Sequence, residues 1–171
     1  MSFPKISIIA SLDEKNGIGK NNRIPWHIRK DLVRLRDMTK DHLVILGRTS
    51  YESMAGYYDK SGRPMPAKEY VVVTSDKNFK SVRNNTFAAT SVQEVLNKIK
   101  DSREKEVFVI GGETIFKQFM EFADRLYLTI VHGTFDCDTF FPDYSDFKKV
   151  ISSEEDSDEG IAFTNKVLER E

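Results

Sequence analysis

Asp31 is the side chain in this sequence whose placement most suggests chemistry. At about 100° per residue, Ile28, Leu32 and Leu35 fall on one apolar stripe of a predicted helix. Asp31 lies at the edge of that stripe. A carboxylate on a buried helix face is costly unless it is paired, hydrogen-bonded or protonated. Asp31 is therefore either a functional carboxylate in an apolar pocket or a structural one tied to a backbone amide, and the helix alone leaves both interpretations open.

Arg48 directly follows the apolar run 43–46 and Gly47, at the expected start of a helix. Thr49 and Glu52 have the spacing of a capping box, which places Arg48 beside the helix N-terminus. Free backbone N–H groups, the positive end of the helix dipole and a guanidinium together favour phosphate binding. The alternative is ordinary turn chemistry after a strand.

Gly111 and Gly112 form a second junction between a strand and a helix, after the run 106–110. Two glycines let a ligand approach the backbone closely. Two such junctions in one sheet predict a dinucleotide across the carboxyl edge, although the G-x-G-x-x-G fingerprint is absent. Gly17 to Asn22 is predicted to be a mobile loop that could close over a ligand.

Strand-length apolar runs alternate with helical patterns, which is typical of an α/β fold. We expect one domain over residues 1–171, with a central, mostly parallel eight-stranded sheet, an antiparallel C-terminal edge hairpin and about four flanking helices. The acidic run Glu154 to Glu159 is predicted to be the solvated loop of that hairpin. Strands are expected at 6–12, 43–46, 70–74, 86–88, 106–110, 126–131, 149–152 and 161–169, and helices at 28–39, 50–54, 91–98 and 113–119.

Composition sets the broad class of protein. The chain has 171 residues, 39% of them hydrophobic and 31% charged, with a net charge of −1, which excludes fibrous and disordered classes and gives no global argument for nucleic acid. The single cysteine, Cys137, excludes an intramolecular disulfide and suits a reducing compartment. Residues 1–12 are expected to form a strand and no signal or anchor, so the cytoplasm is predicted. The three histidines lack ligand spacing, and no metal is expected.

Six motifs, which occur in family order and cover nearly the whole chain, resemble the dihydrofolate reductase family. They are Ile18-Gly19; Pro25-Trp26 followed by Asp31-Leu32; Gly47-Arg48 with Tyr51-Glu52-Ser53; Val109-Ile110-Gly111-Gly112; Leu126-Tyr127-Leu128-Thr129; and Asp138-Thr139-Phe140-Phe141-Pro142. The resemblance implies hydride transfer from NADPH to C6 of dihydrofolate, with a proton added at N5, to give tetrahydrofolate. It also implies a monomer whose partner is the small-molecule substrate, with no nucleic acid and no membrane.

The resemblance also assigns residues to the catalytic and substrate-binding site. Asp31 matches the ionisable group that holds the pterin and promotes protonation, Thr129 matches the hydroxyl bonded to it, and Trp26 would wall the site. Partial burial should raise the pKa of Asp31. The substrate-binding set implied is Ile9, Ala10, Leu32, Leu35, Met54, Arg63, Lys68 and Ile110.

For the cofactor, Arg48 matches the ligand of the 2′-phosphate of NADPH, with Thr74 and Ser75 as hydroxyl partners. The Gly111-Gly112 turn carries a cis peptide in the family, and Asp138 matches a loop residue that hydrogen-bonds the closed form. The cofactor-binding set implied is Ala10, Ile18, Gly19, Lys20, Gly47, Arg48, Thr49, Ser50, Thr74, Ser75, Ile110, Gly111, Gly112, Glu113, Thr114 and Ile115.

Three positions depart from the family pattern. Lys68 stands where the family has an arginine that grips the glutamate tail of folate, and lysine lacks the bidentate fork. Phe116 replaces a frequent tyrosine, and Leu35 a frequent phenylalanine. Lys68 leaves room for a related reductase that acts on a tail-less pterin or on the pyrimidine of riboflavin synthesis. A nucleotide-binding module without turnover, or a protein-interaction module, are the non-enzyme alternatives.

Overall fold

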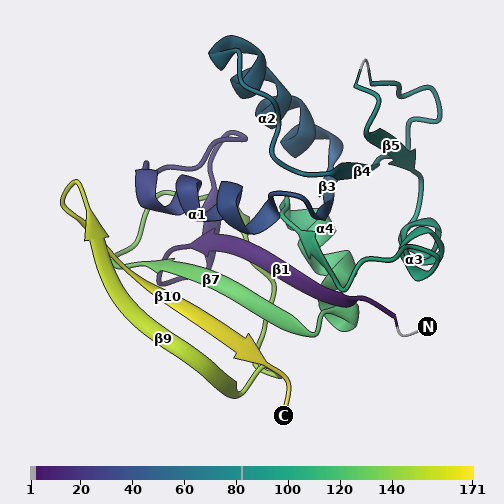
Figure 1. Ribbon diagram of the computed structural model, residues 1–171. Helices are drawn as coiled ribbons and strands as arrows, with labels where there is room; N and C mark the ends of the chain where they lie inside the picture. Colours follow the sequence, from purple (N-terminus) through teal and green to yellow (C-terminus); the bar gives the residue numbers. More distant parts are fainter. Residues whose placement is uncertain (1–2, 82) are drawn as a thin grey trace.

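The computed structural model describes residues 3–81 and 83–171, and a twisted eight-stranded sheet forms its centre (Figure 1). The strand order is β5-β4-β3-β6-β1-β7-β10-β9. The strands are β1 Lys5–Leu12, β3 Leu43–Gly47, β4 Glu69–Val73, β5 Thr86–Ala89, β6 Glu106–Val109, β7 Arg125–Val131, β9 Lys149–Asp158 and β10 Ile161–Glu169. The helices are α1 Arg29–Thr39, α2 Arg48–Ser61, α3 Val92–Lys100 and α4 Glu113–Phe119, followed by the 3-10 turn Met120–Phe122.

Parallel pairing joins β5, β4, β3, β6, β1 and β7, whereas β10 is antiparallel to both β7 and β9. The predicted fold class is therefore confirmed, including the antiparallel edge hairpin. The parallel strands end on one edge of the sheet, and Leu12, Gly47 and Val109 are the last residues of β1, β3 and β6. Loops that leave this edge can meet a common ligand, as is usual in α/β sheets.

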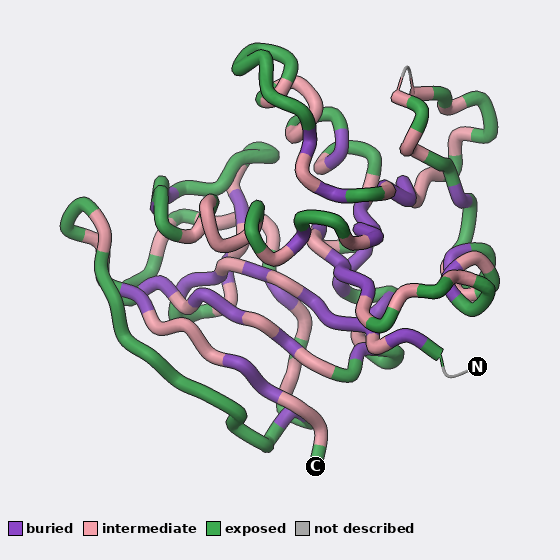
Figure 2. The backbone as a smooth tube through the Cα atoms, viewed as in Figure 1, coloured by how far each residue is buried: buried purple, intermediate pink, exposed green. Residues whose placement is uncertain are grey.

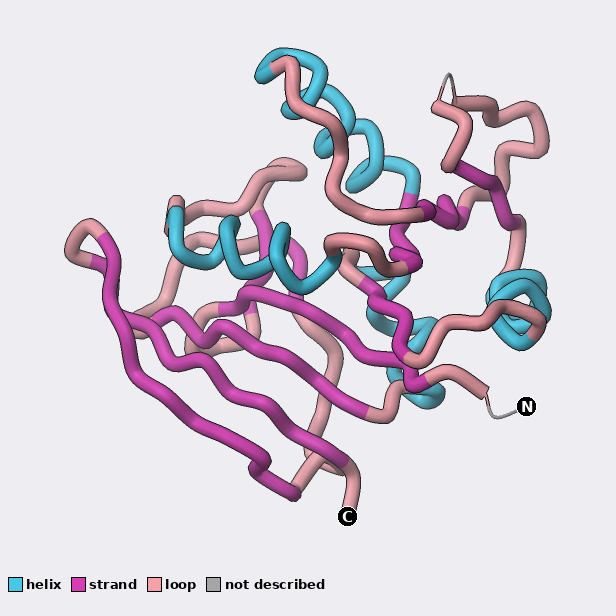
Figure 3. The backbone as a smooth tube through the Cα atoms, viewed as in Figure 1, coloured by secondary structure: helices cyan, strands magenta, loops and turns pink. Residues whose placement is uncertain are grey.

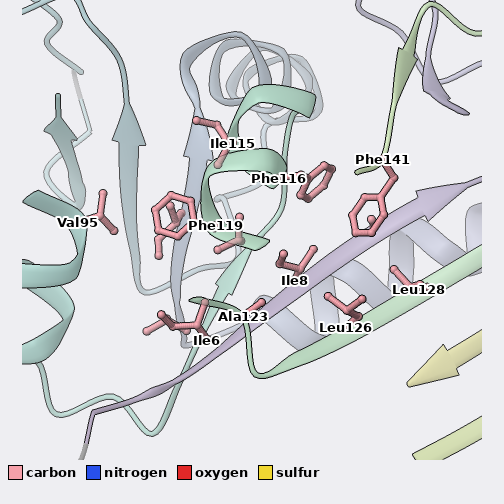
Figure 4. Packing of buried hydrophobic residues seen from close by; sticks show 14 of the residues in the cluster. Ile6, Ile8, Val95, Ile115, Phe116, Phe119, Ala123, Leu126, Leu128 and Phe141 are labelled. Atoms are coloured by element: carbon pink, nitrogen blue, oxygen red, sulfur yellow. The ribbon is translucent and has the colours of Figure 1, made fainter. Parts of the chain in front are cut away.

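The alternation of side chains along each strand produces two cores, one on each face of the sheet. Leu43 and Ile45 of β3 pack with α3 and α4, whereas Val44 and Leu46 pack with residues of α1 and α2. Figure 4 shows the α3 and α4 side, where side chains of α4 lie over the apolar residues of β1 and β7. Because both faces are covered, the interior strands β3, β4 and β6 are mainly apolar.

The acidic run 154–159 belongs mostly to strand β9 and does not form a loop. The hairpin is present, but its expected loop is wrong. β9 continues through Asp158, and only Glu159 and Gly160 form the turn, each with a positive φ. Every residue of β9 before Asp158 is exposed (Figure 2), while the strand runs beside β10 (Figure 3) and its backbone groups on that side are paired in the ladder. An edge strand pairs with a neighbour on one side only, and both of its faces can be exposed to solvent. Its sequence therefore need not alternate between apolar and polar residues, and the strand is hard to recognise from sequence.

Helix α2 is also longer than the expected 50–54. It begins at Arg48 and ends at Ser61, where Gly62 adopts the left-handed conformation with a φ of 71°. Gly47 is the N-cap, without a side-chain hydrogen bond, so the predicted capping role of Thr49 is wrong. The first backbone N–H groups of α2 consequently have no side-chain acceptor.

The predicted mobile loop at 17–22 contains regular structure. Strand β2, Gly17–Gly19, pairs antiparallel with β8, Thr139–Phe140, and a bridge joins Lys20 to Arg23. The carboxylate of Asp13, which is 2% exposed, accepts hydrogen bonds from the backbone N–H groups of Lys15, Gly17 and Phe135. One buried carboxylate therefore fixes the loop after β1 against the segment that follows β7.

Gly17→Ala should destabilise the fold because a Cβ there would lie 2.5 Å from Cys137 Sγ and 2.7 Å from Cys137 Cβ. We expect the free energy of unfolding to fall by about 1–3 kcal/mol in urea denaturation. Gly56→Ala is the matched control, since nothing lies within 4 Å of its Cβ in the interior of α2. It should stabilise by about 0.5–1 kcal/mol. Equal effects at the two sites would contradict the packing of β2 against Cys137.

Candidate active site

A cavity of about 310 Å³ opens between the segment before α1 and the first turns of α1 and α2. It is lined by Asn22, Arg23, Ile24, Trp26, His27, Ile28, Asp31, Leu32 and Ser53. A larger hollow of about 530 Å³ lies beside α3 and the amino end of β1, but its carboxylate, Asp124, already accepts from the backbone N–H of Ile6. The smaller cavity contains the predicted catalytic carboxylate, so we take it as the candidate site.

Asp31 is held at this cavity by hydroxyl groups from the sheet. Thr129 Oγ1 of β7 donates to Asp31 Oδ1 at 2.5 Å, and Ser11 of β1 also faces the carboxyl and lowers its pKa. Trp26 Nε1 donates to Ser11 Oγ at 2.9 Å, which ties the indole to the same group. Burial raises the pKa of Asp31 above its ordinary value, while the bond from Thr129 and the charge of Arg34 oppose the rise. The predicted trio Asp31, Thr129 and Trp26 is thus brought together.

Two residues of this cluster, Ser11 and Asn165, were not identified from the sequence. Asn165 Oδ1 lies 3.1 Å from Thr129 Oγ1 and accepts from Arg34 Nη1 at 2.8 Å. Asn165 is the direct cross-strand partner of Thr129 in the β10 and β7 pairing. A strand register between distant segments places it there, and no local pattern signals that register.

The predicted apolar walls are only partly assembled around the cavity. Leu32 lines it but is 43% exposed, and Leu35 is half-buried, so the α1 stripe borders an open cleft and is not sealed by protein. Ile9, Met54 and Ile110 are partly buried in the core beneath α1 and α2. Ala10 does not line the cavity and packs in the opposite core with α3 and α4, because its neighbour Ile9 takes the other face of β1.

The two cations considered for binding the glutamate tail of folate, Arg63 and Lys68, do not line the cavity. Arg63 is exposed beyond the end of α2. Lys68 Nζ donates to Glu104 Oε1 at 2.8 Å, and this exposed pair lies before the amino ends of β4 and β6. The ammonium of Lys68 already has an anionic partner.

The two junctions between a strand and a helix, at Gly47-Arg48 and at Gly111-Gly112, lie side by side. Gly47 N donates to Gly111 O at 2.8 Å, and the Gly111-Gly112 peptide is cis, as the sequence resemblance implied. Gly111 has a φ of 134°, which is a backbone conformation that residues other than glycine rarely adopt. The Ser50 hydroxyl is near both glycines, 3.6 Å from the position of a Cβ on either.

Arg48 projects from the start of α2 toward the end of β4. Its Nε donates to Glu52 Oε1 at 2.9 Å and its Nη1 to Asp76 Oδ2 at 2.7 Å. The two carboxylates raise the pKa of Arg48, and the bonds from the Asn78 backbone and Arg48 lower that of Asp76. Thr74 follows directly on β4, the partner of β3. The structure therefore gathers the predicted cation and hydroxyl groups at one place, with two acids that the sequence analysis did not assign.

The remaining predicted cofactor residues take three positions. Ile18 and Gly19 lie in or beside β2, and the Lys20 ammonium pairs with Asp136 at 3.5 Å. Asp138 Oδ2 accepts from Asn21 N at 3.1 Å, as the resemblance implied for a closed loop. Glu113 Oε2 accepts from Phe140 N at 2.6 Å, and Ile115 is buried. Thr49, Ser75 and Thr114 are exposed at the starts of α2, the loop after β4 and α4.

Comparisons with known proteins agree with this arrangement. A sequence profile described as dihydrofolate reductase matches residues 5–170. The dihydrofolate reductase of Staphylococcus haemolyticus is 37% identical over 151 residues, which span 87% of this chain and 84% of that protein. The one from Bacillus subtilis (strain 168) is 36% identical over 153 residues, spanning 88% and 83%. The structure of dihydrofolate reductase from Enterococcus faecalis complexed with NADP(H) and RAB-propyl superposes with a TM-score of 0.82 and 29% identity, over 97% of this chain and 96% of that one.

The fold and the cleft define an oxidoreductase built on an α/β sheet. The chain belongs to the dihydrofolate reductase family. Its reaction is the NADPH-dependent reduction of dihydrofolate to tetrahydrofolate. Within the ranges that the structure describes, no helix is long and apolar enough to cross a membrane.

Asp31→Asn should stabilise the folded protein near neutral pH. Because burial raises the folded-state pKa of Asp31, its charge destabilises the fold above that pKa, and the effect disappears below the ordinary value of 3.8. We expect the free energy of unfolding to rise by about 1 kcal/mol at pH 7, with a gain that shrinks on acidification.

Urea denaturation between pH 4 and pH 8 measures this difference. Asp37→Asn is the control, because Asp37 is an exposed carboxylate of the same helix. It should change stability by less than about 0.5 kcal/mol at any pH. A loss of stability in Asp31→Asn that is constant with pH would contradict a costly buried charge at Asp31.

Proposed function

We propose that Asp31 supports protonation of dihydrofolate at N5 during hydride transfer to C6. The observation that carries this proposal is the contact of Asp31 with Thr129, because it fixes a carboxyl of raised pKa at the wall of the cavity. A carboxyl that stays partly protonated near neutrality can deliver a proton directly or through water. The same carboxyl can hold the pterin ring by hydrogen bonds to its nitrogen atoms.

Apolar residues would complete the pterin pocket. Trp26 is 7% exposed and packs on Phe135, with ring centroids 5.1 Å apart, so it forms a rigid wall. Leu32 borders the cavity on α1, and the half-exposed position of Leu32 is consistent with a surface that a bound ring would cover. Exclusion of water by such a ligand would favour hydride transfer over side reactions.

NADPH supplies the hydride, and we propose that it lies across the junctions at Gly47 and Gly111. The uncapped N-terminus of α2 and the Arg48 guanidinium suit its 2′-phosphate, with Thr74 and Ser75 as hydroxyl partners. Glu52 and Asp76 hold the guanidinium at this place before the cofactor arrives. The phosphate would then share or displace one carboxylate, so these acids should moderate the affinity for NADPH.

The β2 segment is proposed to cover the nicotinamide. Its pairing with β8 and the Asn21 to Asp138 hydrogen bond hold Ile18 and Gly19 close to the sheet. Gly19 leaves little room for a side chain, because a Cβ there would lie 2.8 Å from Thr139 Oγ1. These contacts support a loop that presents its backbone and the Ile18 side chain to the cofactor.

Tail-less pterins are proposed as further substrates beside dihydrofolate, and the pairing of Lys68 with Glu104 favours this. A lysine already bonded to a carboxylate is a weak anchor for the glutamate tail of folate. Comparing kcat/KM for dihydrofolate with that for a tail-less dihydropterin tests the proposal. Similar values for the two substrates support it, and a clear preference for dihydrofolate contradicts it.

We also propose that residues 1–171 act as one domain, as a monomer in the cytoplasm. All the groups of the proposed site come from one chain, and the free thiol of Cys137 suits a reducing compartment. Light scattering during size-exclusion chromatography measures the mass in solution. A dimer would contradict the monomer.

Asp31→Asn should lower the turnover of dihydrofolate at pH 7 by about 100-fold or more, because an amide cannot supply the proton. Turnover should recover partly on acidification, as N5 takes its proton from solution. NADPH binding, measured by fluorescence titration, should be unchanged. Asp37→Asn is again the control and should keep normal turnover. Wild-type turnover in Asp31→Asn would rule out the proposed role.

Arg48→Leu should weaken NADPH binding about 10-fold or more and leave NADH binding nearly unchanged, because only NADPH carries the 2′-phosphate. Asp76→Asn should act in the opposite direction and tighten NADPH binding, because it removes the acid that competes for the guanidinium. Isothermal titration with both nucleotides checks each change. Equal weakening of both by Arg48→Leu would indicate a general loss of structure.

A further inference from the structure

The Thr129 hydroxyl lies between two oxygen acceptors and has only one hydrogen to donate. Asp31 Oδ1 is 2.5 Å and Asn165 Oδ1 is 3.1 Å from Thr129 Oγ1, and Thr129 is 2% exposed. An ionised carboxylate and an amide oxygen are both acceptors only. The hydroxyl can therefore satisfy one of them at a time, and the presence of a proton on Asp31 Oδ1 decides which.

The hydroxyl of Thr129 can point in two directions. With Asp31 ionised, or protonated on Oδ2, Thr129 donates to Asp31 Oδ1, and Asn165 Oδ1 is satisfied by Arg34 Nη1 at 2.8 Å. With Asp31 protonated on Oδ1, its O–H donates to Thr129 Oγ1, and the Thr129 hydrogen turns to Asn165 Oδ1. Only the hydrogens move, and every one of these polar groups keeps a partner in both directions.

We propose that Asn165 is a positioning residue that lets the Thr129 hydroxyl reverse, so that Asp31 can hold the proton it needs for reduction. This inference rests on the proposed role of Asp31. Without an acceptor at position 165, the hydrogen of Thr129 would have no partner when the proton of Asp31 is on Oδ1. An unsatisfied buried donor is costly, so the protonated carboxyl would lose this arrangement, and the ionised form would be favoured.

The fold places Asn165 where this role requires it. Asn165 is directly opposite Thr129 in the antiparallel ladder, and such cross-strand pairs have Cβ atoms about 4.5–5.5 Å apart. Arg34, one turn after Asp31 on α1, donates to the same amide oxygen. This bond fixes which end of the Asn165 amide faces Thr129, because a guanidinium can only donate.

Other groups around Asp31 also influence its proton. Arg34 on α1 is the charged group whose effect lowers the pKa of Asp31, and the neutral Ser11 faces it from β1. Arg23 and His27, from the segment before α1, line the same cavity. Asn165→Leu also removes the acceptor of Arg34 Nη1, whether or not Thr129 is present. Only a shift that disappears with Thr129→Val therefore reports on the hydroxyl.

The test is a double-mutant cycle on the pH profile of dihydrofolate reduction. Single-turnover rates at saturating NADPH give the apparent pKa for the wild type, Asn165→Leu, Thr129→Val and the double variant. Asn165→Leu should lower the apparent pKa by roughly 0.5–1 unit, the size expected for one hydrogen bond. In the Thr129→Val background, Asn165→Leu should cause no further shift, because there is no hydroxyl to turn.

Arg34→Gln is the control for charge. It removes a positive charge near Asp31 and should raise the apparent pKa, opposite in sign to Asn165→Leu. Thermal unfolding checks that each variant is folded, and Asn165→Val, which suits a strand, replaces Asn165→Leu if the latter does not fold.

The outcomes separate this inference from the proposed function. An unshifted apparent pKa in Asn165→Leu, or an equal shift with Thr129→Val present, overturns the role of Asn165. If Asp31→Asn has the same pH profile as the wild type, the role of Asp31 itself fails. A downward shift that requires Thr129 supports the inference, because a merely structural loss would lower the rate at every pH without moving the profile.

Discussion

The hydrogen bond between Thr129 and Asp31 is the constraint on which the rest of the site depends. A carboxylate removed from water needs partners, and those of Asp31 come from β1 and β7 through Ser11 and Thr129. Helix α1 must therefore lie close to these strands, and Trp26 is fixed in the same cluster through Ser11. One side of Asp31 still borders the cavity, so the apolar residues of α1 next to it are not fully covered by the rest of the protein. The open stripe is what makes the cleft a binding surface.

Much of the fold and part of the site could be predicted from the sequence, because those signals are local. The interior strands are mainly apolar, and the carboxylate of Asp31 stands out on the apolar stripe of its helix. Ser11, Asp13 and Asn165 could not be found in this way, since their importance arises from partners 15 to 122 residues away in the chain. Nothing in the sequence of β10 indicates that Asn165 faces Thr129 before the register is known.

The errors have physical causes of the same kind. Thr49 has the spacing of a cap, but Gly47 already takes the N-cap position, and the helix N-terminus is left uncapped at the place where a phosphate would bind. The residue type that would best cap the helix and the one that leaves its N–H groups free for a phosphate are therefore different, a conflict that is common at binding sites. The length of α2 was underestimated because its polar residues hide its periodicity, and Gly62 marks its end more clearly than any apolar pattern does.

The exposed acidic edge of β9 has a consequence for behaviour at high concentration. A free edge strand offers unpaired backbone groups to another molecule, and β9 presents Glu154, Glu155 and Asp156 along that edge. An approaching second copy would bring carboxylates against carboxylates, and the repulsion opposes continued strand addition. The protection is electrostatic, so the chain should become more prone to fibrous association at high salt, where the repulsion between these carboxylates is screened.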